Sequence, residues 1–248
     1  HWVVTGSEDH TARLWDLKAP NPALAPIILK GHADPIRTVA MSADNRWVAT
    51  GGWNATARLW DVTTPDPSGS SIVLRGHEDI VHSVAFSNDS RWFVTGSKDK
   101  KARLWDLTRI QTATDPVAVF PHEQDITAVA ISPDSRWVVA ASSSKDALLV
   151  DLSAGLPART KVLRRHLQGI TGVAFSSNNR WLATVSMDNT ACLWNLAAAD
   201  PEVEPIVLRG HEGGTDGSIR AVAFSPDNHW LITGGSDQTV RLWNLRLD

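Results

Sequence analysis

One twelve-residue pattern recurs six times along this 248-residue chain, and it constrains the fold more than any other feature. Successive copies begin 44 to 49 residues apart. The copies are TGSEDHTARLWD (5–16), TGGWNATARLWD (50–61), TGSKDKKARLWD (95–106), AASSSKDALLVD (140–151), TVSMDNTACLWN (184–195) and TGGSDQTVRLWN (233–244). Repetition at such a period predicts that each repeat is one supersecondary unit, which buries its apolar face only by stacking on its neighbours.

Each copy is half of a longer repeat. In five units a histidine stands 28 or 32 residues before the tryptophan position, and three of these histidines follow a glycine: His32, His77, His122, His166 and His211. Between the histidine and the copy lies an apolar segment and then a turn rich in Asp and Asn, such as SADNR at 42–46. Short apolar segments separated by such turns predict four strands in each complete repeat.

The Gly-His pairs, the Trp-Asp endings and the period resemble the WD40 repeat across essentially the whole chain. The resemblance implies an all-β fold, a β-propeller built of four-stranded antiparallel blades. The sequence contains 22 of the 24 strands of six closed blades, so we expect a propeller fragment, and seven blades stay open if sequence is missing upstream. We expect one domain over 1–248, with a partial repeat at 1–17 and complete repeats at about 27–62, 72–107, 117–152, 161–196 and 205–245.

Charge and cysteine content exclude several classes of function. The net charge of −3 and the lack of a basic cluster argue against nucleic acid as a partner, and no basic amphipathic helix suggests membrane binding. Cys192 is the only cysteine, so the chain forms no internal disulfide, which fits a reducing, cytoplasmic compartment. No motif indicates a metal or another cofactor, and we predict none.

The resemblance implies a hydrogen-bonded tetrad of Trp, Thr, His and Asp inside each blade. An indole N–H only donates, a hydroxyl and a neutral imidazole do both, and a carboxylate accepts and ends the series. The first unit offers Trp15, Thr5 and Asp9, and the fourth keeps only His122, beside Ala140, Ser144 and Val150. The fuller sets are Trp60, Thr50, His32 and Asn54; Trp105, Thr95, His77 and Asp99; Trp194, Thr184, His166 and Asp188; and Trp243, Thr233, His211 and Asp237.

A hydroxyl, an imidazole and a carboxylate also make up a catalytic triad. Here the set recurs in every well-formed unit, whereas a nucleophile is normally unique, and a tryptophan caps the hydroxyl. We therefore predict that the chain is not an enzyme. An enzymatic or small-ligand site in the central channel is the alternative, and it requires unique converging carboxylates, histidines or metal ligands, which the sequence does not show.

Positions that vary between repeats are free to specify a partner. Two such columns fall in turns on the side of the Gly-His loops, one just before the tetrad Asp and one at the entry to the inner strand. Trp53 is the most informative residue, because its column otherwise holds Glu, Lys, Ser and Met, and aromatic residues dominate binding hot spots. The predicted partner-binding residues are Trp53, Arg37, His82, Lys98, Met187 and Arg220.

We expect a non-catalytic scaffold that binds a protein or peptide, as the sensor or interaction module of a larger protein. Repeats this regular are similar to those of bacterial WD40 proteins. The basic residues of the columns favour an acidic or phosphorylated partner. The Gly-rich loop at 212–218 is four residues longer than its counterparts, and we expect it to fold over a ligand. Open blade edges predict self-association.

Overall fold

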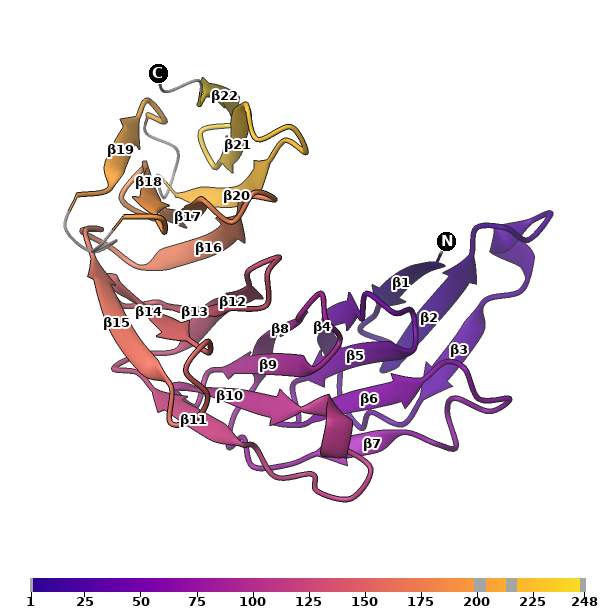
Figure 1. The fold of residues 1–248 in the computed structure, drawn as a ribbon. Coiled ribbons are helices and arrows are strands. Elements are labelled where there is room, and N and C mark those ends of the chain that lie inside the picture. Colours follow the sequence, from indigo (N-terminus) through magenta and orange to yellow (C-terminus); the bar gives the residue numbers. More distant parts are fainter. Residues whose placement is uncertain (1, 199–203, 213–217, 246–248) are drawn as a thin grey trace. The chain divides into compact units, whose positions relative to one another are not determined.

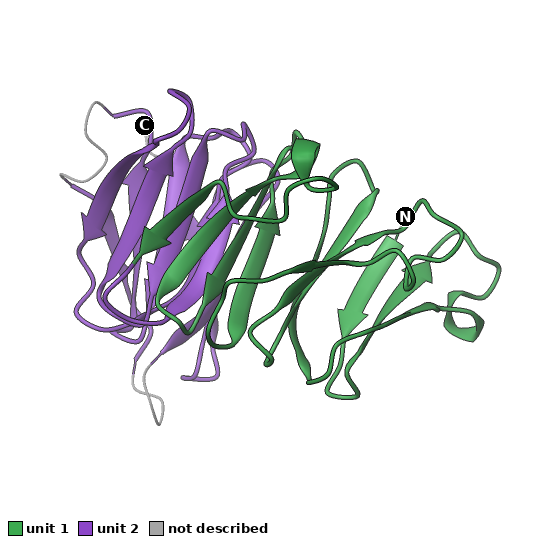
Figure 2. Ribbon diagram, turned by 90° about the horizontal axis from the view of Figure 1, so that it is seen from below, with its two compact units in different colours: residues 1–121 green, residues 122–248 purple. Residues whose placement is uncertain are grey.

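The computed structural model describes residues 2–198, 204–212 and 218–245. These residues form 22 strands and two short 3-10 helices, η1 (Pro22–Leu24) and η2 (Leu107–Arg109), with no α-helix among them (Figure 1). The strands form six separate antiparallel sheets of three or four strands, here numbered 1 to 6 in chain order. The predicted all-β class is therefore confirmed. The chain divides into two compact units, residues 1–121 and 122–248, coloured green and purple in Figure 2.

Unit 1 contains sheets 1 to 3. Each sheet is a simple meander in which consecutive strands pair along their length, as short strands joined by tight turns should. Sheet 1 is β1 (Trp2–Gly6), β2 (Thr11–Asp16) and β3 (Ile27–Lys30). Sheet 2 is β4 (Ile36–Met41), β5 (Trp47–Gly52), β6 (Ala57–Asp61) and β7 (Ile72–Leu74), and sheet 3 is β8 (Val81–Phe86), β9 (Trp92–Ser97), β10 (Lys101–Asp106) and β11 (Ala118–Pro121).

Unit 2 contains sheets 4 to 6 in the same arrangement. Sheet 4 has the longest of the described outer strands, β15, with six residues. Sheet 4 is β12 (Ile126–Ile131), β13 (Trp137–Ser142), β14 (Asp146–Asp151) and β15 (Arg159–Arg164). Sheet 5 is β16 (Ile170–Phe175), β17 (Trp181–Ser186), β18 (Thr190–Asn195) and β19 (Ile206–Arg209), and sheet 6 is β20 (Ile219–Phe224), β21 (Trp230–Gly235) and β22 (Val240–Asn244).

Sheets 1 and 6 have three strands each, as the strand count predicted. In sheet 1, β1 takes the place that β5 has in sheet 2, and no described strand pairs with its other side. In sheet 6, β22 has no outer partner among the described strands. That residues 1–248 form a single domain, as the repeats indicate, stays a prediction.

The core of each unit lies between neighbouring sheets. Ala12, Leu14 and Leu29 of sheet 1 pack on Val48 and Trp60 of sheet 2. The same pattern joins sheets 2 and 3, sheets 4 and 5, and sheets 5 and 6. The tryptophans that end the third strand are fully buried in complete sheets, which is why one indole per repeat recurs in the sequence.

A β-bulge interrupts every described inner strand at its second residue: Arg37, His82, Thr127, Thr171 and Arg220. The register of the ladder shifts at the bulged residue, which re-aims its side chain. These positions are one of the two variable columns predicted from the sequence. In unit 2 the hydroxyl of Thr127 donates to Ile170 O of the next sheet at 2.7 Å, and that of Thr171 donates to Ile219 O.

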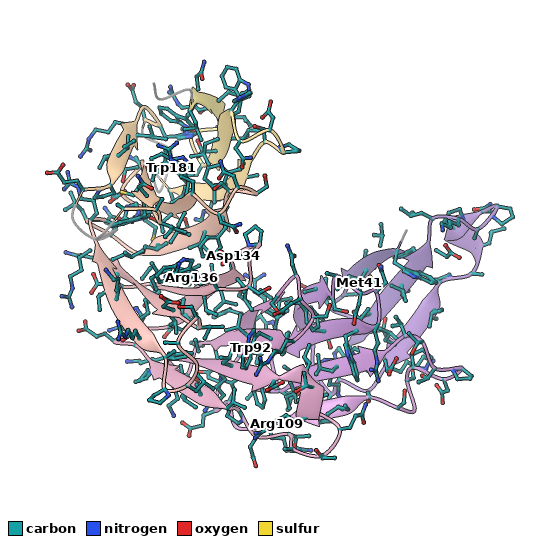
Figure 3. The ribbon with its side chains drawn as sticks, in the orientation of Figure 1. Met41, Trp92, Arg109, Asp134, Arg136 and Trp181 are labelled. Atoms are coloured by element: carbon teal, nitrogen blue, oxygen red, sulfur yellow. The ribbon has the colours of Figure 1, made fainter. Side chains whose placement is uncertain are left out.

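At the opposite end of the sheets, hairpin turns explain the recurring Arg-Trp pair. Asp134 and Arg136 lie in the turn between β12 and β13 (Figure 3). The Asp134 carboxylate accepts the backbone N–H of Arg136 at 3.1 Å, which closes the turn. The Arg136 guanidinium lies 4.7 Å from the centre of the Trp137 ring and pairs with Asp151 at 2.9 Å. Both residues of the recurring Arg-Trp pair therefore have a structural role in this turn.

Candidate functional site

The hydrogen-bonded tetrad of sheet 3 is complete. Trp105 Nε1 donates to Thr95 Oγ1 at 3.1 Å, Thr95 Oγ1 lies 2.7 Å from His77 Nε2, and His77 Nδ1 lies 2.8 Å from Asp99 Oδ2. Burial lowers the pKa of His77 to about 4, against the opposing effect of Asp99. The pKa of Asp99 is also lowered; burial opposes this, but His77 and Arg103 stabilise the carboxylate. The histidine is therefore neutral and the aspartate charged at pH 7.

Sheets 5 and 6 repeat this geometry. In sheet 5, His166 lies 2.8 Å from Thr184 Oγ1 and 3.1 Å from Asp188 Oδ2, and the same carboxylate accepts the N–H of Leu167 at 2.7 Å. A carboxylate only accepts, so the proton of His166 is on Nδ1. The corresponding distances at His211 are 2.8 Å to Thr233 and 2.8 Å to Asp237, and Trp194 and Trp243 donate to the two threonines. Each Asp thus ties the histidine loop to the turn before the third strand.

The tetrad of sheet 2 is weaker at its Asn54 end than the tetrads that end in Asp, although a side-chain interaction with Asn54 partly opposes the lowering of the His32 pKa. Trp60 and His32 bond Thr50 Oγ1 at 2.9 and 2.6 Å, but His32 Nδ1 has no hydrogen-bond partner. The Asn54 amide oxygen instead accepts from the backbone and hydroxyl of Thr56. Burial, followed by the charge of Arg58, lowers the pKa of His32 to about 4. A neutral amide attracts His32 less than a carboxylate does.

In sheet 1, whose unit has no tetrad histidine, the carboxylate of Asp9 takes other hydrogen-bond partners. Trp15 Nε1 donates to Thr5 Oγ1 at 3.1 Å, as in the other sheets. Asp9 pairs with Arg13 at 2.8 Å and accepts from the hydroxyl of Thr11 at 2.6 Å. The carboxylate is therefore held by its own turn.

Sheet 4 has lost the tetrad, and its histidine takes the opposite tautomer. His122 Nδ1 accepts the N–H of Glu123 at 3.0 Å. Burial lowers the pKa of His122, partly offset by Asp146 and Glu123. The ring is thus neutral with its proton on Nε2, and this buried nitrogen has no hydrogen-bond partner. Ala140 and Val150, which replace Thr and Trp, are fully buried and fill the centre of the sheet.

The glycine of the Gly-His pair has a steric role that sequence reasoning missed. In sheets 2 and 6 this glycine faces an arginine on the third strand, which takes the space a side chain would need. In sheet 3 a Cβ on Gly76 would lie at an ordinary 3.5 Å from Arg103 Nε, and the glycine allows the backbone its φ of 121° instead. A Cβ on Gly31 would lie 2.9 Å from Arg58 Nη1, and one on Gly210 would lie 3.0 Å from Arg241 Nη1. In sheet 3, Arg103 Nη2 donates to Gly76 O at 2.6 Å.

Sheets 4 and 5 have neither the glycine nor the arginine. Pro121 and Arg165 precede their histidines, and Leu148 and Cys192 occupy the arginine position. This signal was present in the sequence, because glycine and arginine are found together in three units and are both missing in two. Cys192 is buried, and burial raises its pKa to about 12, so it is an unreactive thiol.

In unit 1, the predicted residues lie at the edge formed by the histidine loops and the turns before the third strands, here called the Gly-His edge. Trp53 is 56% exposed, and its backbone N–H donates to Pro35 O at 3.1 Å. Arg37, two residues after Pro35, is exposed at the bulge of the same sheet. Lys98 is exposed at the position of Trp53 in sheet 3, and His82 is half-buried at the position of Arg37.

In unit 2, Met187 and Arg220 take the same two positions on the Gly-His edge of sheets 5 and 6. Met187 is 39% exposed, and its N–H donates to Gly169 O at 2.9 Å. Arg220 is exposed. The long loop at 212–218, expected to fold over a ligand, falls largely outside the described residues.

The tetrads offer no accessible nucleophile. The distances at Thr95, His77 and Asp99 match those of a catalytic triad, but Thr95 is fully buried and its oxygen accepts from Trp105. A substrate therefore cannot reach the hydroxyl. Across residues 2–198, 204–212 and 218–245, no group of three His, Cys, Asp or Glu is placed to hold a metal ion. In the same ranges, no helix has the length and apolar character needed to cross a membrane.

Six segments of the chain match the family model for the WD domain, G-beta repeat: residues 1–16, 26–61, 69–106, 114–150, 158–195 and 204–244. No curated protein matches the chain. The matched segments cover most of the sequence, so the protein belongs to the WD40-repeat family. From the second onward, each segment begins with the outer strand of one sheet and continues with the first three strands of the next. WD40 repeats generally mediate interactions between proteins, and propellers of this family are typically scaffolds without catalytic activity.

Proposed function

We propose that this protein is a non-catalytic scaffold that binds a protein or peptide through the Gly-His edge of unit 1, centred on Trp53. The carrying observation is the exposure of Trp53, a large aromatic side chain on a backbone fixed by the hydrogen bond to Pro35. No other described sheet has an aromatic residue at this position, so the fold does not require it. An exposed aromatic side chain on a rigid backbone binds with little loss of conformational entropy.

Arg37 favours an acidic or phosphorylated segment as the ligand. Arg37 is exposed, two residues after Pro35, which binds the Trp53 backbone, and its guanidinium offers planar, charge-assisted hydrogen bonds to carboxylate or phosphate. Lys98 contributes less, since its ammonium lies 3.9 Å from the Asp79 carboxylate. His82 would complete the contact surface in this unit, and Met187 and Arg220 are candidate contacts in unit 2.

The proposal also covers the larger protein, the compartment and the self-association of the chain. We infer a role as the interaction or sensor module of a larger, bacterial-type protein in a cytoplasmic compartment, which the single buried thiol of Cys192 supports. Among the described strands, β1 of sheet 1 and β22 of sheet 6 have no partner on one side, and such an edge is a template for pairing with another chain. Self-association through these edges is therefore a second mode of contact.

The test is selection of binders from a random linear peptide library, followed by calorimetric titration of the enriched peptides. Trp53→Ala is expected to weaken binding by roughly 30-fold, which corresponds to a hot spot of about 2 kcal/mol. Arg37→Ala should weaken binding of acidic or phosphorylated peptides selectively. Trp230→Ala is the control, because Trp230 is a partly exposed tryptophan at the opposite end of its sheet. Wild-type affinity in a folded Trp53→Ala variant would show that the site lies elsewhere.

A further inference from the structure

Unit 2 contains a cavity of about 460 Å³ on its Gly-His edge, between sheets 4 and 5. Two loops form its walls, the turn at 143–146 of sheet 4 and the loop at 167–169 that enters sheet 5, together with the beginning of the His122 loop. We call this cavity the serine pocket. It is lined by Glu123, Gln124, Ser143, Ser144, Lys145, Asp146, Leu167, Gln168 and Gly169.

The serine pocket lies where the tetrad of sheet 4 is lost. In sheets 3, 5 and 6 the tetrad Asp accepts the backbone N–H that follows the histidine and ties the histidine loop to the turn. In sheet 4 the equivalent residue is Ser144, and its Oγ has no hydrogen-bond partner. The N–H of Glu123 turns instead to the ring of its own neighbour, His122. No side-chain hydrogen bond therefore ties the His122 loop to the turn at 143–146, and the space between this loop and the turn stays open.

The backbone of the serine pocket is nevertheless well positioned. The N–H of Ser143 donates to Asp125 O at 2.9 Å, and that of Ile170 donates to Ser144 O at 3.3 Å. Gly169 lies so close to the turn that a Cβ would be 2.6 Å from Ser143 O. The walls therefore exist before a ligand arrives.

The lining combines polar hydrogen-bonding groups with one exposed apolar contact. Leu167 is 67% exposed, although its N–H is fixed by Asp188. Met187, also exposed, is bonded through its backbone to Gly169 of the pocket wall. Around them, serine hydroxyls and glutamine amides both donate and accept. This pattern suits an extended peptide, whose backbone needs polar partners on one side while its side chain needs an apolar one.

Charge selects among peptides. Asp146 pairs with Arg164 at 3.2 Å, which leaves Lys145 and Glu123 as opposite charges in the lining. The pocket is thus close to neutral, in contrast to the cationic Arg37 beside Trp53. A lining with nearly equal polar and apolar surface also differs from the predominantly apolar cavities that enclose small molecules.

We propose that the serine pocket binds a short, extended, uncharged peptide segment whose aliphatic side chain rests on Leu167 and Met187. The proposal rests on the peptide-binding function proposed above but places a separate site of different selectivity in unit 2. In this proposal, the loss of the tetrad gives sheet 4 a role in peptide binding.

The smallest probe of this chemistry is N-acetyl-leucine methylamide, titrated against the isotope-labelled chain and followed by amide chemical shifts. A probe of this size binds with about 1 mM affinity at best. The expected shifts cluster at Lys145, Leu167, Gln168, Gly169 and Met187. The methylamides of N-acetyl-aspartate and N-acetyl-lysine should bind at least fivefold more weakly.

Leu167→Ser is expected to weaken binding of the probe at least fivefold without unfolding, because this side chain is mostly exposed. Leu24→Ser, at a residue 80% exposed in unit 1, is the matched control and should leave binding unchanged. Shifts spread over the whole surface, equal binding of the charged probes, or full binding by Leu167→Ser would overturn the proposal. Trp53→Ala should not affect the probe. Loss of library-peptide binding in Trp53→Ala without any mapping to the serine pocket would retain the proposed function and reject this site.

Discussion

Replacing the histidine of a complete tetrad should destabilise the protein far more than replacing the histidine of sheet 4. His77→Ala removes one hydrogen-bond partner each from Thr95 Oγ1 and Asp99 Oδ2, both buried. Thr95 Oγ1 still accepts from Trp105 Nε1. Asp99 keeps its ion pair with Arg103 at 2.8 Å, so the loss is not that of a bare charge. Leaving a buried polar group under-satisfied costs about 1–3 kcal/mol, so two such groups, each with one partner or more remaining, give a loss of roughly 2–4 kcal/mol.

His122→Ala removes only the bond to the N–H of Glu123, an exposed residue whose amide water can satisfy. It also removes the buried Nε2–H that has no partner. The expected cost is about 0–1 kcal/mol, because the lost bond and the lost desolvation penalty offset each other.

Thermal unfolding followed by tryptophan fluorescence measures both effects. For a chain of this size 1 kcal/mol corresponds to about 2–4 °C in Tm, so His77→Ala should lower Tm by roughly 5–15 °C and His122→Ala by at most about 4 °C. Thr95→Ser keeps the hydroxyl and serves as the control for a conservative change in the same tetrad. Equal Tm shifts for the two alanine variants would show that the tetrad is not a stabilising unit.

Four further predictions follow from the same groups. The pKa values of His32 and His77 are lowered from 6.5 to about 4, so the stability they contribute is fully present above pH 6.5 and is lost as pH falls toward 4, by roughly 3 kcal/mol each at pH 4. Urea midpoints measured from pH 7 to 4 check this, and His77→Ala should flatten the curve. Long-range ¹H–¹⁵N correlation should place the proton of His122 on Nε2 and that of His166 on Nδ1; the same tautomer at both would contradict the contacts described. Cys192, with its pKa raised to about 12, should react with a thiol reagent only as fast as the protein unfolds, and immediate labelling in the native state would count against its burial. Gly210→Ala should cost about 1 kcal/mol or less through crowding with the flexible end of Arg241, and a double-mutant cycle with Arg241→Cys in urea should show that this cost depends on the arginine.

The repeated pattern was sufficient to predict the strands of this chain, because each short segment carries its own turn and its own alternation. The three-stranded first and last sheets followed from the same strand count. The exceptions were local side-chain contacts, which the alignment of residue types between repeats does not determine. Asn54 aligns with the tetrad Asp, but its neutral amide bonds Thr56, two residues further on, rather than His32.

The candidate site was less accessible to sequence reasoning. Variation between repeats located the columns of Trp53 and Arg37, yet it gave no indication that Arg37 occupies a β-bulge. The serine pocket was missed for a different reason. A missing tetrad was evident in the sequence, but the open space beside Ser144 depends on how two loops pass each other, and loop geometry is not encoded in a period.

The contact between the glycine loop and the third-strand arginine has a consequence for protein engineering. Gly31 stands against Arg58 in sheet 2 and Gly210 against Arg241 in sheet 6, whereas sheet 5 has Arg165 and Cys192 at these two positions. A chimaera that took its histidine loop from sheet 5 and its third strand from sheet 2 would place a side chain against a guanidinium. Grafted binding loops on this scaffold should therefore be moved as a cassette that carries the third strand with them.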